Sequence, residues 1–124
     1  KAVIKIKQLM AESNAVINLH EMKEKDSAVI IDDKGLSKIA EKVIRKVNRA
    51  DKKTKLVLWD YRTGSADSEH PEQKGSATYY AYFNHGTPAF GVDLSQKSLS
   101  LEDRVKMHKK VLDAFMDELG IERL

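Results

Sequence analysis

The chain has 124 residues, of which 41% are hydrophobic and 33% charged, and it contains no cysteine. This composition is globular and predicts a single domain over residues 1–124, since domains typically hold about 100–150 residues. The lack of cysteine excludes disulfides, thiolate metal sites and cysteine nucleophiles. No apolar run reaches the roughly 18–20 residues of a membrane span. The first residue is lysine, which predicts a processed chain. We expect a soluble, cytoplasmic protein.

The first third of the chain fits more than one pattern. In residues 1–22, VIKIK and VINLH alternate as strands do around a turn-like AESN, which predicts a hairpin. A helix is the alternative, with Val3, Ile6, Met10 and Ile17 along one side. The apolar run SAVIID predicts a short strand that follows.

Residues 35–49 predict an amphipathic helix, with Asp32 or Asp33 as the residue that caps its start. Its apolar stripe consists of Leu36, Ile39, Ala40, Val43, Ile44 and Val47. The next segment, TKLVLWDY, predicts a strand. Because both faces of this segment are largely apolar, we expect it to lie centrally in the sheet.

The last half of the chain predicts two more strands and a second helix. A polar loop, RTGSADSEHPEQKGS, leads into a strand over residues 77–84, and the turn NHGTP leads into the strand AFGVDL. A helix over residues 101–119 is indicated by Ser100 as N-cap, Gly120 as a left-handed stop and Ile121 as the apolar contact beyond it. Its apolar seam consists of Leu101, Val105, His108, Leu112, Phe115 and Leu119.

Together these elements predict an α+β fold. We expect an antiparallel sheet of about five to six strands, because short connections join the last three strands. The two amphipathic helices would bury their stripes by packing on one face of that sheet.

Aromatic residues suggest one candidate site. Strand alternation over residues 77–84 turns Tyr79 and Phe83 toward the helices, and we expect Phe83 and Phe90 to lie in the core. The same alternation turns Tyr80, Tyr82 and Asn84 outward, near His85 in the following turn. An exposed row of tyrosines is a platform on which nucleic-acid bases stack. The alternative is that strands favour aromatic residues without any ligand.

Basic residues suggest a second surface. Residues 34–55 hold nine basic and two acidic residues. Four lysines, Lys34, Lys38, Lys42 and Lys46, recur every fourth residue along the predicted helix. An anionic partner such as a nucleotide or nucleic acid explains such a ridge. A solvated helix face is the equal alternative, since lysine is a good helix former.

The histidines leave room for catalysis. His85 with Arg62 or Lys74 provides the groups for metal-independent RNA cleavage. His70 lies at the other end of the predicted strand, about 20 Å away at ~3.3 Å per residue, which argues against a two-histidine site within one chain. His108 is expected to be a satisfied, half-buried core residue, and His20 lies near the end of an ambiguous element.

No metal or cofactor site is predicted. The cluster DSEHPE is best explained as a solvated turn. The sequence also lacks a phosphate-binding glycine loop, an HExxH motif and a nucleophile elbow.

We therefore favour a small binding protein for a nucleotide or nucleic acid, including RNA, over an enzyme. Two alternatives are kept, namely the metal-independent endoribonuclease and a protein–protein antagonist whose aromatic strand is the interface. A homodimer closed over the aromatic sheet face is a further expectation. The predicted ligand residues are Tyr80, Tyr82, Asn84, His85, Arg62, Lys38, Lys42 and Lys46.

Overall fold

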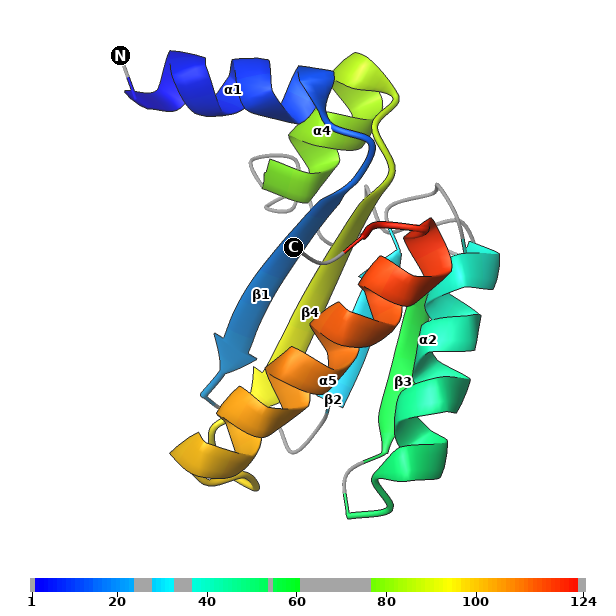
Figure 1. The fold of residues 1–124 in the computed structure, drawn as a ribbon. Helices are drawn as coiled ribbons and strands as arrows, with labels where there is room; N and C mark the ends of the chain where they lie inside the picture. Colours follow the sequence, from blue (N-terminus) through cyan, green and yellow to red (C-terminus); the bar gives the residue numbers. More distant parts are fainter. Residues whose placement is uncertain (1, 24–27, 33–36, 54, 61–76, 123–124) are drawn as a thin grey trace.

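The computed structural model describes residues 2–23, 28–32, 37–53, 55–60 and 77–122 (Figure 1). Its elements, in chain order, are α1 (Ala2–Glu12), β1 (Val16–Met22), β2 (Ala28–Asp32), α2 (Ser37–Ala50), β3 (Leu56–Asp60), α4 (Ala77–His85), β4 (Ala89–Ser95) and α5 (Leu101–Leu119). The described residues thus form an α+β fold of four helices and four strands, which confirms the predicted class. The predicted count of five to six strands and two helices is wrong.

The sheet is mixed, with the strand order β1-β4-β2-β3. β1 runs parallel to β4, β2 runs parallel to β3, and only the pair β2–β4 is antiparallel. The prediction of a wholly antiparallel sheet is therefore wrong. β3 lies at an edge of the described sheet and not centrally as expected, whereas β4 and β2 are the central strands.

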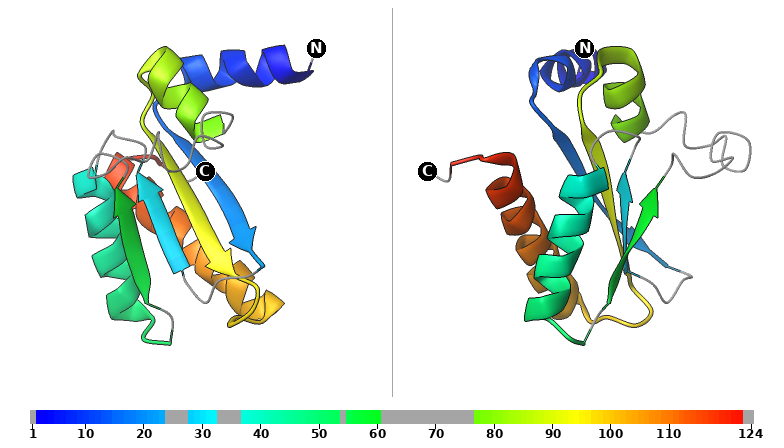
Figure 2. Two further views of the ribbon diagram at one scale, coloured as in Figure 1. Left: turned by 180° about the vertical axis from the view of Figure 1, so that it is seen from behind. Right: turned by 90° about the vertical axis from the view of Figure 1, so that its right-hand side faces the viewer.

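The core lies between one face of the sheet and the two helices α2 and α5. Both helices lie on the same side of the sheet (Figure 2), as the sequence predicted. The core side chains from the central strands include Ile30, Val92 and Leu94, each 0% exposed. Phe90 and Phe115 pack with ring centroids 4.7 Å apart, and the core position predicted for Phe90 is confirmed.

Helix α5 begins and ends as the sequence indicates. Ser100 is extended, with φ −63° and ψ 161°, and its hydroxyl accepts a hydrogen bond from the backbone N of Asp103. Gly120 is left-handed at φ 69°, and the N–H of Ile121 donates to the carbonyl of Met116 at 2.9 Å. These are the backbone hydrogen bonds of a Schellman end, which confirms Ser100 as N-cap and Gly120 as the left-handed stop. Ile121 is 43% exposed, and its predicted apolar contact stays a prediction. The cap predicted for α2 at Asp32 or Asp33 lies outside the residues whose side chains are described.

Two segments differ from their predicted structure. Residues 2–12 form a helix, so the predicted hairpin is wrong, although VINLH is a strand as expected. Residues 77–85 form α4 instead of a strand. Thr78 and Ala81, three residues apart, are the buried side chains of this helix. Their helical spacing places both on one buried side of α4, and this tertiary packing overrides the strand preference of the neighbouring tyrosines.

None of the described helices is long and apolar enough to cross a membrane. The cytoplasmic location and the single domain over residues 1–124 stay predictions.

Candidate functional site

Helix α4 carries the aromatic residues of the first predicted site. Its phenol Tyr80 Oη lies 3.1 Å from His85 Nε2, and the ammonium of Lys7 lies 4.7 Å from the centre of the Tyr80 ring. Tyr80 and Tyr82 are half-buried, whereas Phe83 is 40% exposed. The predicted core position of Phe83 is wrong, because on a helix it does not share a face with Ala81.

The flat row of outward tyrosines is absent, because residues 77–85 do not form a strand. On α4, Tyr79 stacks on Phe83 with centroids 4.0 Å apart, and Tyr82 meets Phe83 edge-on at 5.2 Å. These rings pack on one another within the helix. The stacking platform for bases, and the homodimer closed over it, are therefore wrong in their structural premise. Asn84 is exposed at the end of the same helix.

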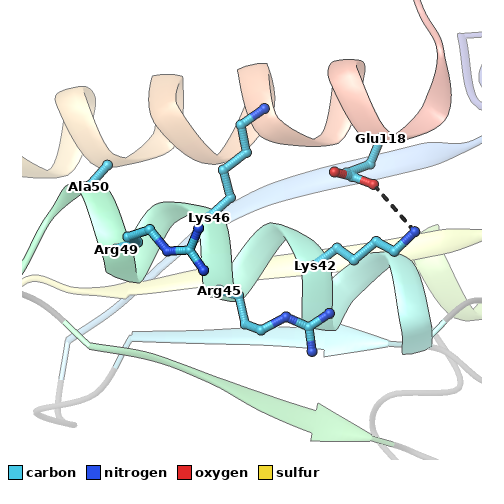
Figure 3. Close-up of a pocket in the computed structure, with 6 residues that line it drawn as sticks. All are labelled: Lys42, Arg45, Lys46, Arg49, Ala50 and Glu118. Atoms are coloured by element: carbon cyan, nitrogen blue, oxygen red, sulfur yellow. Dashed lines mark ion pairs between the residues drawn. The ribbon is translucent and has the colours of Figure 1, made fainter.

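The lysine ridge lies on α2, where it faces carboxylates of α5. Lys46 Nζ lies 2.6 Å from Asp117 Oδ2, and Lys42 Nζ lies 4.0 Å from Glu118 Oε2. Figure 3 shows both lysines extending toward α5, whereas Arg45 points away from it. A surface pocket of about 480 Å³ lies beside these lysines. It is lined by Lys42, Arg45, Lys46, Arg49, Ala50 and Glu118.

Part of the ridge is thus explained by carboxylates within the chain. Such exposed pairs contribute about 0–1 kcal/mol each, so they join the middle of α2 to the last turn of α5 without fixing the two helices rigidly. Lys38 is exposed on the same helix. The α2 lysines and the α4 aromatics belong to different parts of the fold. Helix α4 lies beyond one end of β1 and β4, next to α1, whereas α2 packs on the face of the sheet (Figure 1). Arg62, Lys74, His70 and Lys34 lie outside the described residues.

A different pair of side chains lies at the sheet itself. His20 on β1 and Asp93 on β4 are direct partners in the parallel ladder. Val92 points into the core beneath the helices, so strand alternation turns Asp93 to the opposite face. There it shares the surface with His20 and with Val29, its partner on β2. The parallel register therefore brings an imidazole and a carboxylate together from distant parts of the chain.

Burial changes the protonation of this pair. Asp93 is half-buried, and burial raises the pKa of its carboxyl, while the charge of His20 opposes that rise. His20 is exposed. A half-buried carboxyl with a raised pKa beside an accessible imidazole is a pattern found at acid–base sites.

His108 lies near this pair, on the covered side of the sheet. It is half-buried as predicted, but its Nδ1 is buried and has no hydrogen-bond partner in the structure, so it is not satisfied. Burial lowers the pKa of His108, and the charges of Glu21 and Asp93 partly oppose this effect. Among the described residues, no three histidine, aspartate or glutamate side chains gather as a metal-binding group.

Sequence reasoning missed both members of the pair. His20 was set aside because its segment was ambiguous, and Asp93 was not singled out. One signal was available, since Asp93 is the only charged residue within the apolar strand AFGVDL. A carboxylate in a strand that is otherwise buried requires a specific environment.

The chain is similar in fold to solved structures of Csd4 from Helicobacter pylori, a D,L-carboxypeptidase. Its mDAP-bound form has a TM-score of 0.80 and 21% identity, and its tripeptide-bound form has 0.78 and 22%. Its product-bound form has a TM-score of 0.79 and 20% identity. Each match covers 97% of this chain but 34% of the Csd4 chain. No protein family and no curated protein sequence matches the chain.

These comparisons correct the predicted function. The solved proteins that share this fold bind mDAP and a tripeptide, so the nucleotide- or nucleic-acid-binding prediction, its RNA-binding form and its anionic nucleotide partner are wrong. The ribonuclease alternative is overturned by the same comparison, since it too required a nucleic-acid ligand. The antagonist alternative is overturned because its aromatic strand at residues 77–84 is a helix. The likeness shows the fold alone at this identity, and the chain spans about a third of the Csd4 chains. The ligand roles of individual residues stay predictions.

Proposed function

We propose that this chain is part of a carboxypeptidase that acts on mDAP-containing peptides, with Asp93 and His20 at its reaction site. The observation that carries the proposal is the match over 97% of the chain, at a TM-score of 0.80, to the D,L-carboxypeptidase Csd4. The pair His20 and Asp93, found independently of this match, supplies candidate acid–base groups on the sheet. Since the match spans 34% of the Csd4 chain, we propose that further residues complete the site.

The chemistry of the pair suits this reaction. A carboxypeptidase adds water to the carbonyl carbon of the last peptide bond, the C–N bond breaks, and the leaving amine takes up a proton. A carboxylate with a raised pKa is a stronger base than an ordinary aspartate, so it accepts a proton from water more readily, and the carboxylic acid formed in this way carries the proton that the leaving amine takes up. Asp93 has that property through burial. His20 lies opposite it on the neighbouring strand and is accessible to a peptide.

The position of Asp93 also suits catalysis. Its strand, β4, is central and is paired on both sides, with β1 and with β2. Its chain neighbours Val92 and Leu94 are fully buried. A reactive group held by such a strand keeps its place better than one on a loop.

The test is binding and hydrolysis of an mDAP-containing tripeptide by the intact protein. Binding is followed by calorimetry, and release of the C-terminal residue by mass spectrometry. We expect Asp93→Asn to lower the rate by roughly 10²-fold or more, the usual contribution of a general acid–base group. The wild-type rate should also fall as acid protonates Asp93, through the range to which burial has raised its pKa.

A matched control isolates Asp93. Asp103→Asn removes an exposed carboxylate in the first turn of α5. It should retain the wild-type rate and the wild-type affinity. Either of two results contradicts the proposal: a folded protein that neither binds nor cleaves the tripeptide, or an Asp93→Asn variant as active as the control.

A further inference from the structure

The last residues of β1 are fastened to the start of α5 by a polar cluster. Glu21 accepts a hydrogen bond from Arg104 Nε at 2.9 Å through one carboxylate oxygen and from Gln96 Nε2 at 2.7 Å through the other. The backbone N–H of Gln96 donates to the carbonyl of Met22 at 2.8 Å. Arg104 also donates from Nη1 to the carbonyl of Leu99 at 2.6 Å. Both oxygens of one carboxylate are thereby held by groups far away in sequence.

This ion pair is more buried than the pair Lys106–Glu102 within the same helix. The side chain of Arg104 is 13% exposed and that of Glu21 30%, whereas in the pair Lys106–Glu102 the values are 62% and 77%. The hydrogen bonds from Gln96 and Arg104 lower the pKa of Glu21, which therefore stays ionised at neutral pH. Lys106–Glu102 joins two residues of one helix, while Arg104–Glu21 joins a helix to a strand.

The end of β1 gains from such a fastening. β1 lies at one edge of the described sheet, with β4 as its neighbour, and the end of an edge strand opens more easily than that of a central one. Side chains alternate along a strand, so Glu21 points to the helix-covered face and His20 to the other face. A fixed Glu21 therefore fixes the rotation of the backbone that presents His20 to Asp93.

We propose that Arg104 is a positioning residue that acts through Glu21 to hold His20 opposite Asp93. This inference rests on the proposed function, since it assigns Arg104 a role at that same site. Arg104 itself extends from α5 toward Glu21 on the covered face, so it acts on the reaction site through the strand and not by touching the substrate. Gln96 and the Gln96–Met22 backbone bond secure the same strand end.

The first experiment measures amide hydrogen exchange in Arg104→Gln. We expect exchange at residues 20–22 to become roughly 10-fold faster or more, while the amides of β2 keep their protection, because only the end of β1 is released. Lys106→Gln is the matched control, since it breaks an exposed pair of the same helix, and it should leave these amides unchanged. Glu21→Gln removes the same ion pair from the strand side with almost the same shape, and it should reproduce the effect if Arg104→Gln folds poorly.

The second experiment separates positioning from a merely structural role and uses no substrate. The titration of the Asp93 carboxyl is followed by carbon NMR with and without the further change His20→Ala. In the wild type, removal of His20 should raise the pKa of Asp93, because the charge of His20 opposes the effect of burial. In the Arg104→Gln background that difference should shrink by at least half, and Arg104→Lys should restore part of it.

Unchanged coupling between His20 and Asp93 in a folded Arg104→Gln protein overturns the positioning role, and so does unchanged exchange at residues 20–22. Because neither measurement involves a peptide, both outcomes stand apart from a failure of the proposed function. If the tripeptide is cleaved, Arg104→Gln should lower kcat by about 10-fold with KM within twofold, since it alters the placement of a reacting group and not the peptide contacts.

Discussion

The two faces of the sheet are built from alternate residues of the same strands, yet they differ in burial and in polarity. On the covered face, Ile30, Val92 and Leu94 are completely buried beneath α2 and α5. On the other face, Asp93 is half-buried, His20 is exposed and Val57 is 44% exposed. Neighbours in the chain, Val92 and Asp93, therefore have opposite surroundings.

This difference gives the two faces different roles: one contributes most to the stability of the fold, and the other carries ionisable side chains. The covered face excludes water and supplies the apolar burial that favours folding. The other face keeps ionisable groups in contact with solvent, at the cost of partial desolvation of Asp93. A rigid covered face can hold a reactive pair in place on the opposite face through a single layer of backbone. Substitutions on the two faces should accordingly have different consequences.

The largest effect is expected from Phe115→Ala. Phe115 is fully buried against Phe90 on the covered face, and removal of its ring leaves a cavity that costs about 3–5 kcal/mol of unfolding free energy. Val57→Ala on the other face should cost less than about 1 kcal/mol, since Val57 is well exposed. Urea unfolding of both variants measures the comparison. Equal losses would mean that both faces are buried in solution.

A smaller effect is expected from Ser100→Ala. The Ser100 hydroxyl accepts from the backbone N of Asp103 at the start of α5, and loss of such a cap costs about 1 kcal/mol. Ser98→Ala, at an exposed serine two residues earlier, should change the unfolding free energy by no more than about 0.5 kcal/mol. If the two variants unfold at the same urea concentration, the Ser100 cap does not stabilise α5 and so adds nothing to the stability of the covered face.

The covered face was predicted in part. The stripe of α2 and the signals at Ser100 and Gly120 indicate the observed structure. The predicted seam of α5 is largely wrong, because Leu101, Val105 and Leu112 are 66%, 44% and 36% exposed, whereas Met107, Val111 and Ala114 are buried together with Phe115. In α4 the local signals conflict, because tyrosine and phenylalanine favour strands, while Thr78 and Ala81 are buried together at helical spacing. Strand direction was not predictable either. The parallel pairing of β1 with β4 joins segments from the two ends of the chain, and no local pattern encodes it.

The candidate site was harder still to predict, for the same reason. His20 and Asp93 become neighbours only through the parallel register, and neither residue belongs to a motif of fixed spacing. The groups that the sequence did emphasise, the lysines of α2 and the tyrosines of α4, have partners within the chain, such as Asp117 for Lys46 and His85 for Tyr80. The local abundance of a residue type here coincided with contacts inside the chain, whereas the candidate site contains a single aspartate within an apolar strand.

The smallest effect is a difference in melting temperature that depends on pH, expected from Asp93→Asn. Burial raises the pKa of Asp93 in the folded protein above its unfolded value, so the folded state binds this proton more tightly than the unfolded state does. The wild type should therefore lose stability as pH rises through this range, and asparagine avoids that loss. We expect Asp93→Asn to melt at a slightly higher temperature than the wild type at pH 7 and at the same temperature near pH 3. Asp103→Asn should do the opposite at pH 7, because its charge is favourable at the start of α5. A melting temperature lowered by Asp93→Asn equally at both pH values would show that the charge of Asp93 costs nothing on its face. The contrast between the two faces would then be one of exposure alone.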